Sequence, residues 1–433
     1  MSIASDDRSG SFRLSRERLP SLTGMRFIGA FGVFLYHATG PFMFPPGTFD
    51  QRVPFATRNV GALALSFFFI LTGFVLTWSA RPADGPGRFW FRRIVKLYPN
   101  HFVTFLIMLV LLDFTNLWSF RDGATGVLPS LFLVQSWSPN PYINIGINAV
   151  SWSLSVDAFF LLLFPAWLWL LNRIRVDRLW YWLAGVVGLI IAVPFIAQLL
   201  PFEPMLPPQL IGAPTSAWQW WFVYNSPATR ALECLAGSLA ARIILHGLWP
   251  KMSLKAVLPF LFVTYTISIF LPINWYGIVA ISAVPMILVT VALTQRDVEG
   301  QRSFLGHPWM LWLGAIAYAF YLLHRIILEV FIPGFAKNIQ WNWLSATGMI
   351  LLMLALTVGL SWALFALVER PLVRKFSPSD PTGRTPAPEA DLSGRESAER
   401  ESVKEVDQYG RPVPATRAEP VGVAAGKDGG RRA

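Results

Sequence analysis

The sequence predicts an all-α, polytopic membrane protein with about ten transmembrane helices and with both termini in the cytoplasm. Of its 433 residues, 54% are hydrophobic and only 14% are charged, whereas about a quarter of the residues of a soluble domain are charged. The mean hydropathy is +0.47. Apolar runs of roughly 20 residues, the length that a helix needs to cross a hydrocarbon core of about 30 Å, recur along the chain.

These runs divide the chain into three parts. Residues 1–21 form a basic leader, residues 22–376 form the transmembrane domain, and residues 377–433 form a tail rich in Pro, Gly, Ser, Ala and charges of both signs. The tail cannot bury enough apolar surface to offset its ordering entropy, so we expect a disordered cytoplasmic segment. The apolar runs of the transmembrane domain begin near Leu22, Gly61, Tyr98, Trp152, Leu179, Ala231, Leu254, Trp275, Trp309 and Trp343.

Basic residues predict the orientation. With the N-terminus in the cytoplasm, the segments Arg88–Lys96, Arg173–Arg178 and Arg370–Lys375 all fall on the cytoplasmic side. The positive-inside rule therefore favours a multi-pass protein of the cell membrane, of the bacterial inner-membrane type, with the lipid bilayer as its surroundings. Because these loops account for much of the formal net charge of +11, we expect no nucleic-acid partner. The oligomeric state stays open.

A single cysteine limits the chemistry that the chain can support. Disulfide scaffolds, cysteine-ligated zinc sites and iron–sulfur clusters each need at least two thiols, and this chain has one. These three classes are therefore excluded, and we also expect no metal ion.

The first predicted helix carries two ionisable side chains, Arg26 and His37. Such residues are costly within a bilayer and are candidates for function. Eleven residues bring the two side chains to within about 20° on the helical wheel and separate them by about 16 Å along the axis. The structural alternatives are a neutral histidine bonded inside the helix bundle and an arginine whose side chain reaches the lipid headgroups.

Acidic residues of other predicted helices reach the depth of His37. Asp157 and Glu233 each lie near the start of a helix that runs inward from the outer side. Asp157 has no partner on its own helix, so His37 and Asp157 are the predicted catalytic pair. Structural ion pairs are the alternative for the others, namely Arg230 with Glu233 at i, i+3 and Arg325 with Glu329 at i, i+4.

The opposite ends of the helices are basic. Such a cluster suits phosphate groups, and anionic lipid is the alternative ligand. Its members are Arg26, Arg92, Arg93, Lys96 and Arg370.

Several short motifs together resemble the acyltransferase-3 family. They are, in chain order, Arg26 and His37 with ten residues between them, the run Ser66–Phe74, Arg92–Arg93 ahead of Tyr98–Pro99, Trp152–Asp157, Leu305–Gly306, Ala317–His324 and Glu369–Pro371. The resemblance spans residues 22–376. The family usually has a glutamate where this chain has Asp157, whose side chain is one methylene shorter.

The resemblance implies a membrane-bound O-acyltransferase. Such enzymes move an acyl group, usually acetyl, from acyl-CoA on the cytoplasmic side to a hydroxyl of a sugar, a glycan or a secondary metabolite. It also implies that Arg26 and His37 are the residues most closely tied to activity. The expected acceptor is thus a carbohydrate or a small molecule.

The residues then take the following predicted roles. His37 is the general base and Asp157 fixes its tautomer, although a covalent acyl-histidine is an open alternative. Arg26 holds the phosphates of CoA, with Arg92, Arg93 and Arg370 as further contacts. The predicted acceptor side comprises Tyr321, His324, Glu233 and Arg325.

Two other functions compete with this prediction. Buried Arg, His, Asp and Glu residues also occur in transporters, so a transporter or flippase for a sugar or an anion is one rival. A sensor or scaffold that binds partners through residues 377–433 is the second. Acceptor-dependent release of free CoA distinguishes the enzyme from the transporter. Deletion of residues 377–433 should abolish the function of a sensor or scaffold and leave catalysis largely intact.

Overall fold

The computed structural model describes residues 19–40, 52–80, 85–115, 124–206, 215–271, 278–335 and 341–376. No β-strand occurs within these ranges, where a single isolated bridge joins Met205 and Ser216. The predicted all-α class is therefore confirmed. The predicted tail 377–433 and residues 1–18 of the predicted leader lie outside the described ranges.

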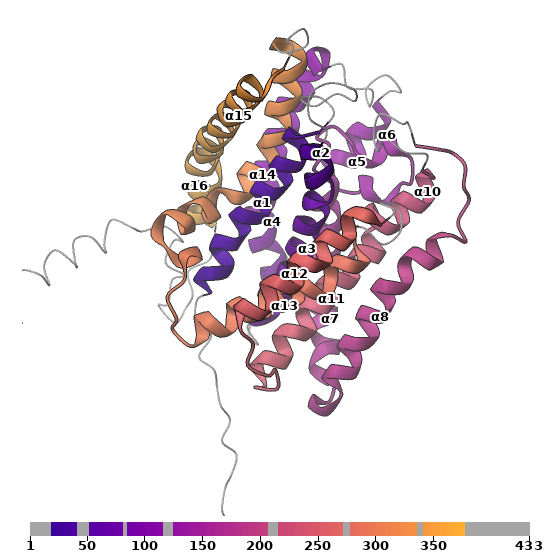
Figure 1. Cartoon of the computed structure of the whole chain (residues 1–433), viewed down its shortest axis with the longest axis vertical. Helices are drawn as coiled ribbons and strands as arrows, with labels where there is room; N and C mark the ends of the chain where they lie inside the picture. Colours follow the sequence, from indigo (N-terminus) through magenta and orange to yellow (C-terminus); the bar gives the residue numbers. More distant parts are fainter. Residues whose placement is uncertain are drawn as a thin grey trace, which may run out of the picture. The chain divides into compact units, whose positions relative to one another are not determined.

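Each of the predicted apolar runs coincides with a helix (Figure 1). These helices are α1 (Pro20–Ala38), α3 (Val60–Trp78), α4 (Pro86–Thr115), α7 (Trp152–Arg173), α8 (Leu179–Ala197), α11 (Pro227–Leu245), α12 (Leu254–Phe270), α13 (Ala280–Val298), α14 (Pro308–Phe335) and α15 (Trp343–Leu364). Shorter helices join them, namely α2 (Arg52–Thr57), α5 (Val127–Leu131), α6 (Pro141–Asn144), α10 (Ala217–Trp220) and α16 (Arg370–Phe376). Residues Trp221–Asn225 and Phe365–Glu369 form single π-helical turns.

Seven helical segments of the described chain are long and apolar enough to cross a membrane. They comprise all or most of α3, α4, α7, α8, α13, α14 and α15. Helix α12 is apolar but shorter, whereas α1 and α11 carry more small and polar residues. These segments confirm a multi-pass membrane protein. The count of about ten spans and the cytoplasmic placement of the termini stay predictions.

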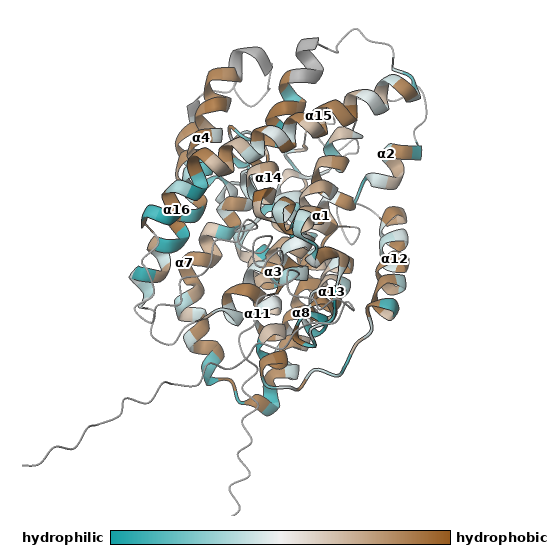
Figure 2. Ribbon diagram, turned by 90° about the vertical axis from the view of Figure 1, so that its left-hand side faces the viewer, coloured by the Kyte–Doolittle hydropathy of each residue, from teal (hydrophilic) through white to brown (hydrophobic). Residues whose placement is uncertain are grey.

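The helices differ in how much of their surface other helices cover. In α3, α13 and α14, about two thirds or more of the residues in the most apolar stretch are buried inside the protein. In α15 and α4 the buried shares are only 22% and 28%. Figure 2 shows apolar residues along the outer helices α4, α12 and α15, and hydrophilic residues on α16. The outer helices therefore have the apolar surface that lipid requires, and the inner ones can hold polar groups.

Small residues bring α3 and α11 into close contact. A Cβ atom on Gly73 would collide with the carbonyl oxygen of Cys234, and one on Gly237 would collide with that of Ile70. Ser238, one residue further along α11, donates a hydrogen bond to the carbonyl oxygen of Gly73 (3.1 Å). Close approach of backbones through glycine is a common way to pair helices in membranes.

Polar side chains fix the ends of two other helices. Asp297 of α13 accepts hydrogen bonds from the backbone N–H (2.9 Å) and the hydroxyl (2.6 Å) of Ser21, at the start of α1. Arg242, near the end of α11, donates to the carbonyl oxygens of Leu171 and Ile174 where α7 ends. Both contacts bond backbone groups at helix ends, where intrahelical partners run out, although the carbonyl oxygen of Leu171 also accepts from the N–H of Ile174 (3.3 Å).

Candidate active site

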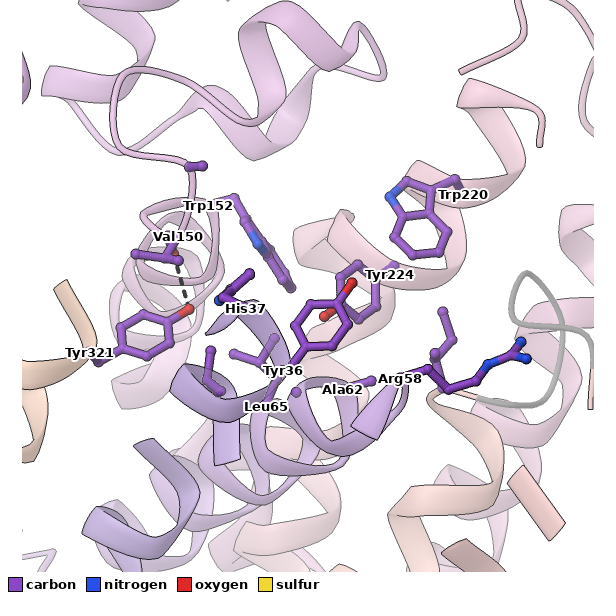
Figure 3. A pocket seen from close by; sticks show the side chains of 14 residues that line it. Tyr36, His37, Arg58, Ala62, Leu65, Val150, Trp152, Trp220, Tyr224 and Tyr321 are labelled. Atoms are coloured by element: carbon purple, nitrogen blue, oxygen red, sulfur yellow. Dashed lines mark hydrogen bonds between the residues drawn. The ribbon is translucent and has the colours of Figure 1, made fainter. Parts of the chain in front are cut away.

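A cavity of about 110 Å³ lies among α1, α3, α14 and the segments that precede α7 and α11. Five aromatic residues and several small or aliphatic ones form its wall, and His37 and Arg58 contribute polar groups (Figure 3). Ligand pockets commonly combine an apolar wall with a few polar groups. The aromatic residues of the wall are Tyr36, Trp152, Trp220, Tyr224 and Tyr321.

His37 lies in the last turn of α1, half-buried at the cavity wall. Its Nδ1 atom is 3.0 Å from Nε2 of His324, and the two rings are stacked with their centroids 5.2 Å apart. His324 is fully buried in α14, and its Nδ1 atom is 2.6 Å from the carbonyl oxygen of Tyr321. The structure therefore brings His37, His324 and Tyr321 together, as a consequence of the extensive packing of α1 against α14.

Tyr321 connects α14 to the chain ahead of α7. Its hydroxyl donates to the carbonyl oxygen of Val150 (3.1 Å) and shares a hydrogen bond with the hydroxyl of Ser153 (2.8 Å). Val150 lines the cavity, and Figure 3 shows the tyrosine ring beside His37. Tyr321 thus lies at the cavity wall, and its role on the acceptor side stays a prediction.

Asp157 has a different partner from the one that the sequence predicts. Its carboxylate is hydrogen-bonded to the side chain of Thr72 on α3. The hydrogen bond to the imidazole of His37 that the sequence predicts for Asp157 is made by His324 instead. The reason is its depth in the membrane domain, since Asp157 lies five residues, or about 7 Å, further along α7 than the cavity residue Trp152.

Two of the predicted acceptor-side residues belong to ion pairs. Arg230 and Glu233 are fully buried with their charged groups 3.1 Å apart, and Arg325 and Glu329 are 2.5 Å apart. The structural alternative for these four residues is confirmed. Among the described residues, the lining of the cavity includes Tyr321 but not Glu233, Arg325 or His324.

The predicted phosphate-binding residues lie on three helices. Arg26 is on α1, eleven residues before His37, and Arg92 and Arg93 are on the first part of α4. Arg370 begins α16, which packs against α4. Asn100 of α4 donates a hydrogen bond to Glu369, the residue before Arg370 (2.5 Å). Helices α4 and α16, which carry Arg92, Arg93 and Arg370, therefore pack against each other.

Sequence reasoning missed several cavity residues. Tyr36 could have been found from its position next to His37, with a ring centroid 4.9 Å away. Arg58, Trp220 and Tyr224 come from segments that are distant in sequence, and only the fold brings them to the same cavity. The π-helical turn Trp221–Asn225 supplies Tyr224, and such turns occur frequently at functional sites.

Comparison with known proteins places the chain in a family. The acyltransferase-domain model of the acyltransferase-3 family matches residues 19–365. The acyltransferase MdmB of Streptomyces mycarofaciens is 36% identical over 385 residues, which make up 86% of this chain and 96% of MdmB. No solved structure matches the chain.

Two further relatives are described as peptidoglycan O-acetyltransferases. The putative enzyme YrhL of Bacillus subtilis is 24% identical over 82% of this chain and 55% of its own length. The enzyme OatA of Listeria monocytogenes is 22% identical over 74% of this chain and 51% of its own length. This chain thus spans about half the length of these two relatives. The family model and MdmB cover most of the chain, which therefore belongs to the acyltransferase-3 family of integral membrane O-acyltransferases.

Proposed function

We propose that this enzyme moves an acyl group, most often acetyl, from acyl-CoA to a hydroxyl of an acceptor bound in the aromatic cavity. The observation that carries the proposal is the placement of His37, which lies at the wall of the cavity while Arg26 lies near the other end of the same helix. Histidine is the commonest general base in proteins. The cavity offers it a partly enclosed space in which an acceptor hydroxyl can be activated.

The reaction needs one base and produces one thiol. His37 takes the proton of the acceptor hydroxyl as the oxygen attacks the thioester carbonyl. The new C–O bond forms, the C–S bond breaks, and the thiolate of CoA takes the proton back from His37. The products are the acyl ester and free CoA. A covalent acyl-histidine is the competing route, in which Nε2 attacks the thioester first.

The basic residues suit the phosphates of the donor. Arg26, Arg92, Arg93 and Arg370 carry guanidinium groups, which bind phosphate through paired hydrogen bonds. The axial distance from Arg26 to His37 is about 16 Å, which is comparable to an extended pantetheine arm. The nucleotide would thus stay at the predicted cytoplasmic side while the thioester reaches His37.

The wall of the cavity favours a cyclic acceptor with an apolar face. The relatives YrhL and OatA are described as acting on peptidoglycan, which supports a carbohydrate acceptor. Aromatic side chains such as Trp152, Trp220 and Tyr224 offer flat faces for ring stacking, and Arg58 offers a cation at the edge of the cavity. We therefore propose a sugar, a glycan or a glycosylated small molecule, modified at a bacterial inner membrane.

Release of thiol from acetyl-CoA tests the proposal. The full chain in nanodiscs is supplied with acetyl-CoA and with candidate acceptors, either sugars or peptidoglycan fragments, and compared with His37→Gln. We expect acceptor-dependent thiol release that His37→Gln reduces at least 100-fold, the lower end of a general base's contribution. Equal thiol release by both proteins would contradict the role of His37, and none from either across a panel of donors would contradict the use of acyl-CoA.

A quench experiment separates the two routes. Radiolabelled acetyl-CoA is mixed with the enzyme without acceptor, and the protein is recovered under mild conditions. Label that stays on the wild-type protein and is absent from His37→Gln would favour the acyl-histidine. Its absence from both, together with turnover when acceptor is added, would favour direct transfer.

A further inference from the structure

We propose that His324 is the positioning residue that fixes the tautomer of His37, so that the unprotonated Nε2 atom of His37 is the one available in the cavity. This inference rests on the proposed function for its catalytic consequence. Its structural part, which states which of the four ring nitrogens of His37 and His324 carry a hydrogen, does not depend on the proposed function. The proposal moves His324 from the acceptor side to a position behind the base, where it touches neither the acceptor nor the donor.

The hydrogen-bond chain begins at a backbone carbonyl group. Nδ1 of His324 lies 2.6 Å from the carbonyl oxygen of Tyr321, one turn earlier on α14. A carbonyl oxygen only accepts hydrogen bonds, so this nitrogen must carry a hydrogen. In a neutral imidazole the other nitrogen, Nε2, then has a lone pair and accepts.

The surroundings of His324 favour the neutral ring. The side chain is fully buried, and the rings in contact with it are those of Phe34, Phe320, Tyr321 and His37. The charge that acts on it from the next residue is a cation, Arg325, whose own carboxylate partner is Glu329. A second buried positive charge beside Arg325 would be costly.

The same donor–acceptor argument applies to the next ring, that of His37. Nε2 of His324 lies 3.0 Å from Nδ1 of His37. Because the nitrogen of His324 accepts, Nδ1 of His37 must donate, and the hydrogen of neutral His37 is therefore on Nδ1. This leaves Nε2 without a hydrogen, ready to accept a proton from a hydroxyl in the cavity that His37 lines.

The arrangement performs the task that a buried carboxylate performs in a Ser-His-Asp site, but without a negative charge. When Nε2 of His37 takes the hydroxyl proton, Nδ1 still donates to His324, and the hydrogen bond becomes charge-assisted. The proton later moves from Nε2 to the leaving thiolate. His37 then returns to the tautomer in which it began.

Nitrogen NMR measures the tautomer directly. The full chain has only five histidines, so the protein in nanodiscs, labelled with ¹⁵N at histidine alone, gives a sparse spectrum in which protonated and unprotonated ring nitrogens are separated. The signals of His37 are those lost in His37→Gln. We expect a protonated Nδ1 and an unprotonated Nε2 in the wild type, and a mixture of both neutral tautomers in His324→Leu. A hydrogen on Nε2 in the wild type, or an unchanged His37 in His324→Leu, would overturn the inference.

Kinetics provide the second measurement. We expect His324→Leu to lower kcat about 100-fold, with the KM for acetyl-CoA changed less than about threefold. His37 then loses both its fixed tautomer and the hydrogen-bond acceptor that stabilises its protonated form, while the donor contacts remain. His324→Gln offers a carbonyl oxygen to Nδ1 of His37 and should recover part of kcat. A KM effect as large as the kcat effect, or no recovery in His324→Gln, would contradict a positioning role.

A matched variant controls for the loss of a buried imidazole. His101 on α4 is also buried, and its Nε2 atom lies 2.9 Å from the carbonyl oxygen of Ser130. We expect His101→Leu to keep the wild-type tautomer at His37 and a kcat within about threefold of the wild type. If the NMR signals are as expected and no acyl donor is consumed, the proposed function fails and the tautomer assignment stands.

Discussion

Tyr321 shows how one hydroxyl can shape the cavity. The hydroxyl of Tyr321 donates a hydrogen bond to the carbonyl oxygen of Val150 and shares one with the hydroxyl of Ser153. These bonds connect the start of α7 and the residues before it to α14 at the cavity wall. The ring of Tyr321 is a further part of that wall. The carbonyl group of the same residue holds His324. Side chain and backbone of Tyr321 therefore act on two different parts of the site.

Removing this hydroxyl tests its role. Tyr321→Phe removes one of the two hydroxyl donors to the carbonyl oxygen of Val150, the other being Ser153 (3.1 Å). We expect a loss of about 1 kcal/mol in the free energy of unfolding and a several-fold lower turnover. The control is Tyr318→Phe, one turn earlier on α14, which loses a comparable bond to the carbonyl oxygen of Leu97 (2.8 Å). Thermal unfolding in detergent and thiol release measure the two effects. A loss of turnover in Tyr318→Phe as large as in Tyr321→Phe would contradict a local effect at the cavity.

A second substitution tests the end of α1 that is proposed to bind acyl-CoA. Arg26→Gln removes a guanidinium proposed to bind the phosphates of CoA, and we expect the KM for acetyl-CoA to rise about tenfold or more with a smaller change in kcat. Arg173→Gln is the control, since Arg173 stacks on Trp169 with its guanidinium 3.5 Å from the ring centroid, at the end of α7. Steady-state kinetics over a range of acetyl-CoA concentrations give both constants. An equal rise in KM for both variants would indicate a general effect of surface charge.

At the scale of the helices, the close approach of α3 and α11 positions much of the site. Helix α3 supplies Gly61, Ala62 and Leu65 to the cavity, and the π-helical turn ahead of α11 supplies Tyr224. The two helices meet deeper, through Gly73 and Gly237. A change at that contact would therefore move opposite walls of the cavity.

Adding one methyl group at the contact tests this dependence. The Cβ atom of Gly73→Ala would meet the backbone of α11, which cannot move aside as a flexible side chain could. We expect a loss of about 1–3 kcal/mol in the free energy of unfolding, the usual cost of overpacking. Gly185→Ala on α8 is the control, because a Cβ atom there meets open space, and the substitution should be neutral or slightly stabilising. Denaturant titration in detergent compares the two, and equal stabilities would contradict the importance of the contact.

The arrangement of the helices explains which contacts the sequence could predict and which it could not. Apolar runs located the helices, and spacing within one helix correctly paired Arg230 with Glu233 and Arg325 with Glu329. The partner of His37 could not be found in this way, because it depends on how α1, α7 and α14 are rotated about their axes. Asp157 and His324 both lay at a suitable predicted depth, and only the packed helices distinguish them.

At the scale of the whole molecule, the orientation in the membrane is a prediction from basic loops. The described loops offer exposed positions on both predicted sides. Asp177, between α7 and α8, is exposed and falls on the predicted cytoplasmic side. Gln198, at the end of α8, is exposed and falls on the opposite side. The native thiol of Cys234 is fully buried.

Cysteine labelling tests the orientation. We expect Gln198→Cys to react with a membrane-impermeant maleimide in intact cells, and Asp177→Cys to react only after the membrane is opened. The unmodified chain should stay unlabelled in both conditions because Cys234 is buried, so it serves as the control. The reverse pattern would place the N-terminus outside, and labelling of Asp177→Cys and Gln198→Cys in intact cells would place both ends of α8 on one side.

The uninterrupted helix α1 fixes the distance between the proposed phosphate-binding residue and the proposed base. It runs from Pro20 to Ala38, with Arg26 near one end and His37 near the other. One inserted residue between them would turn His37 by about 100° and shift it by about 1.5 Å, away from both His324 and the cavity. The length of the helix thereby sets which donors are useful. A thioester carried much nearer to, or much farther from, its phosphates than about 16 Å would bind at Arg26 and still miss His37.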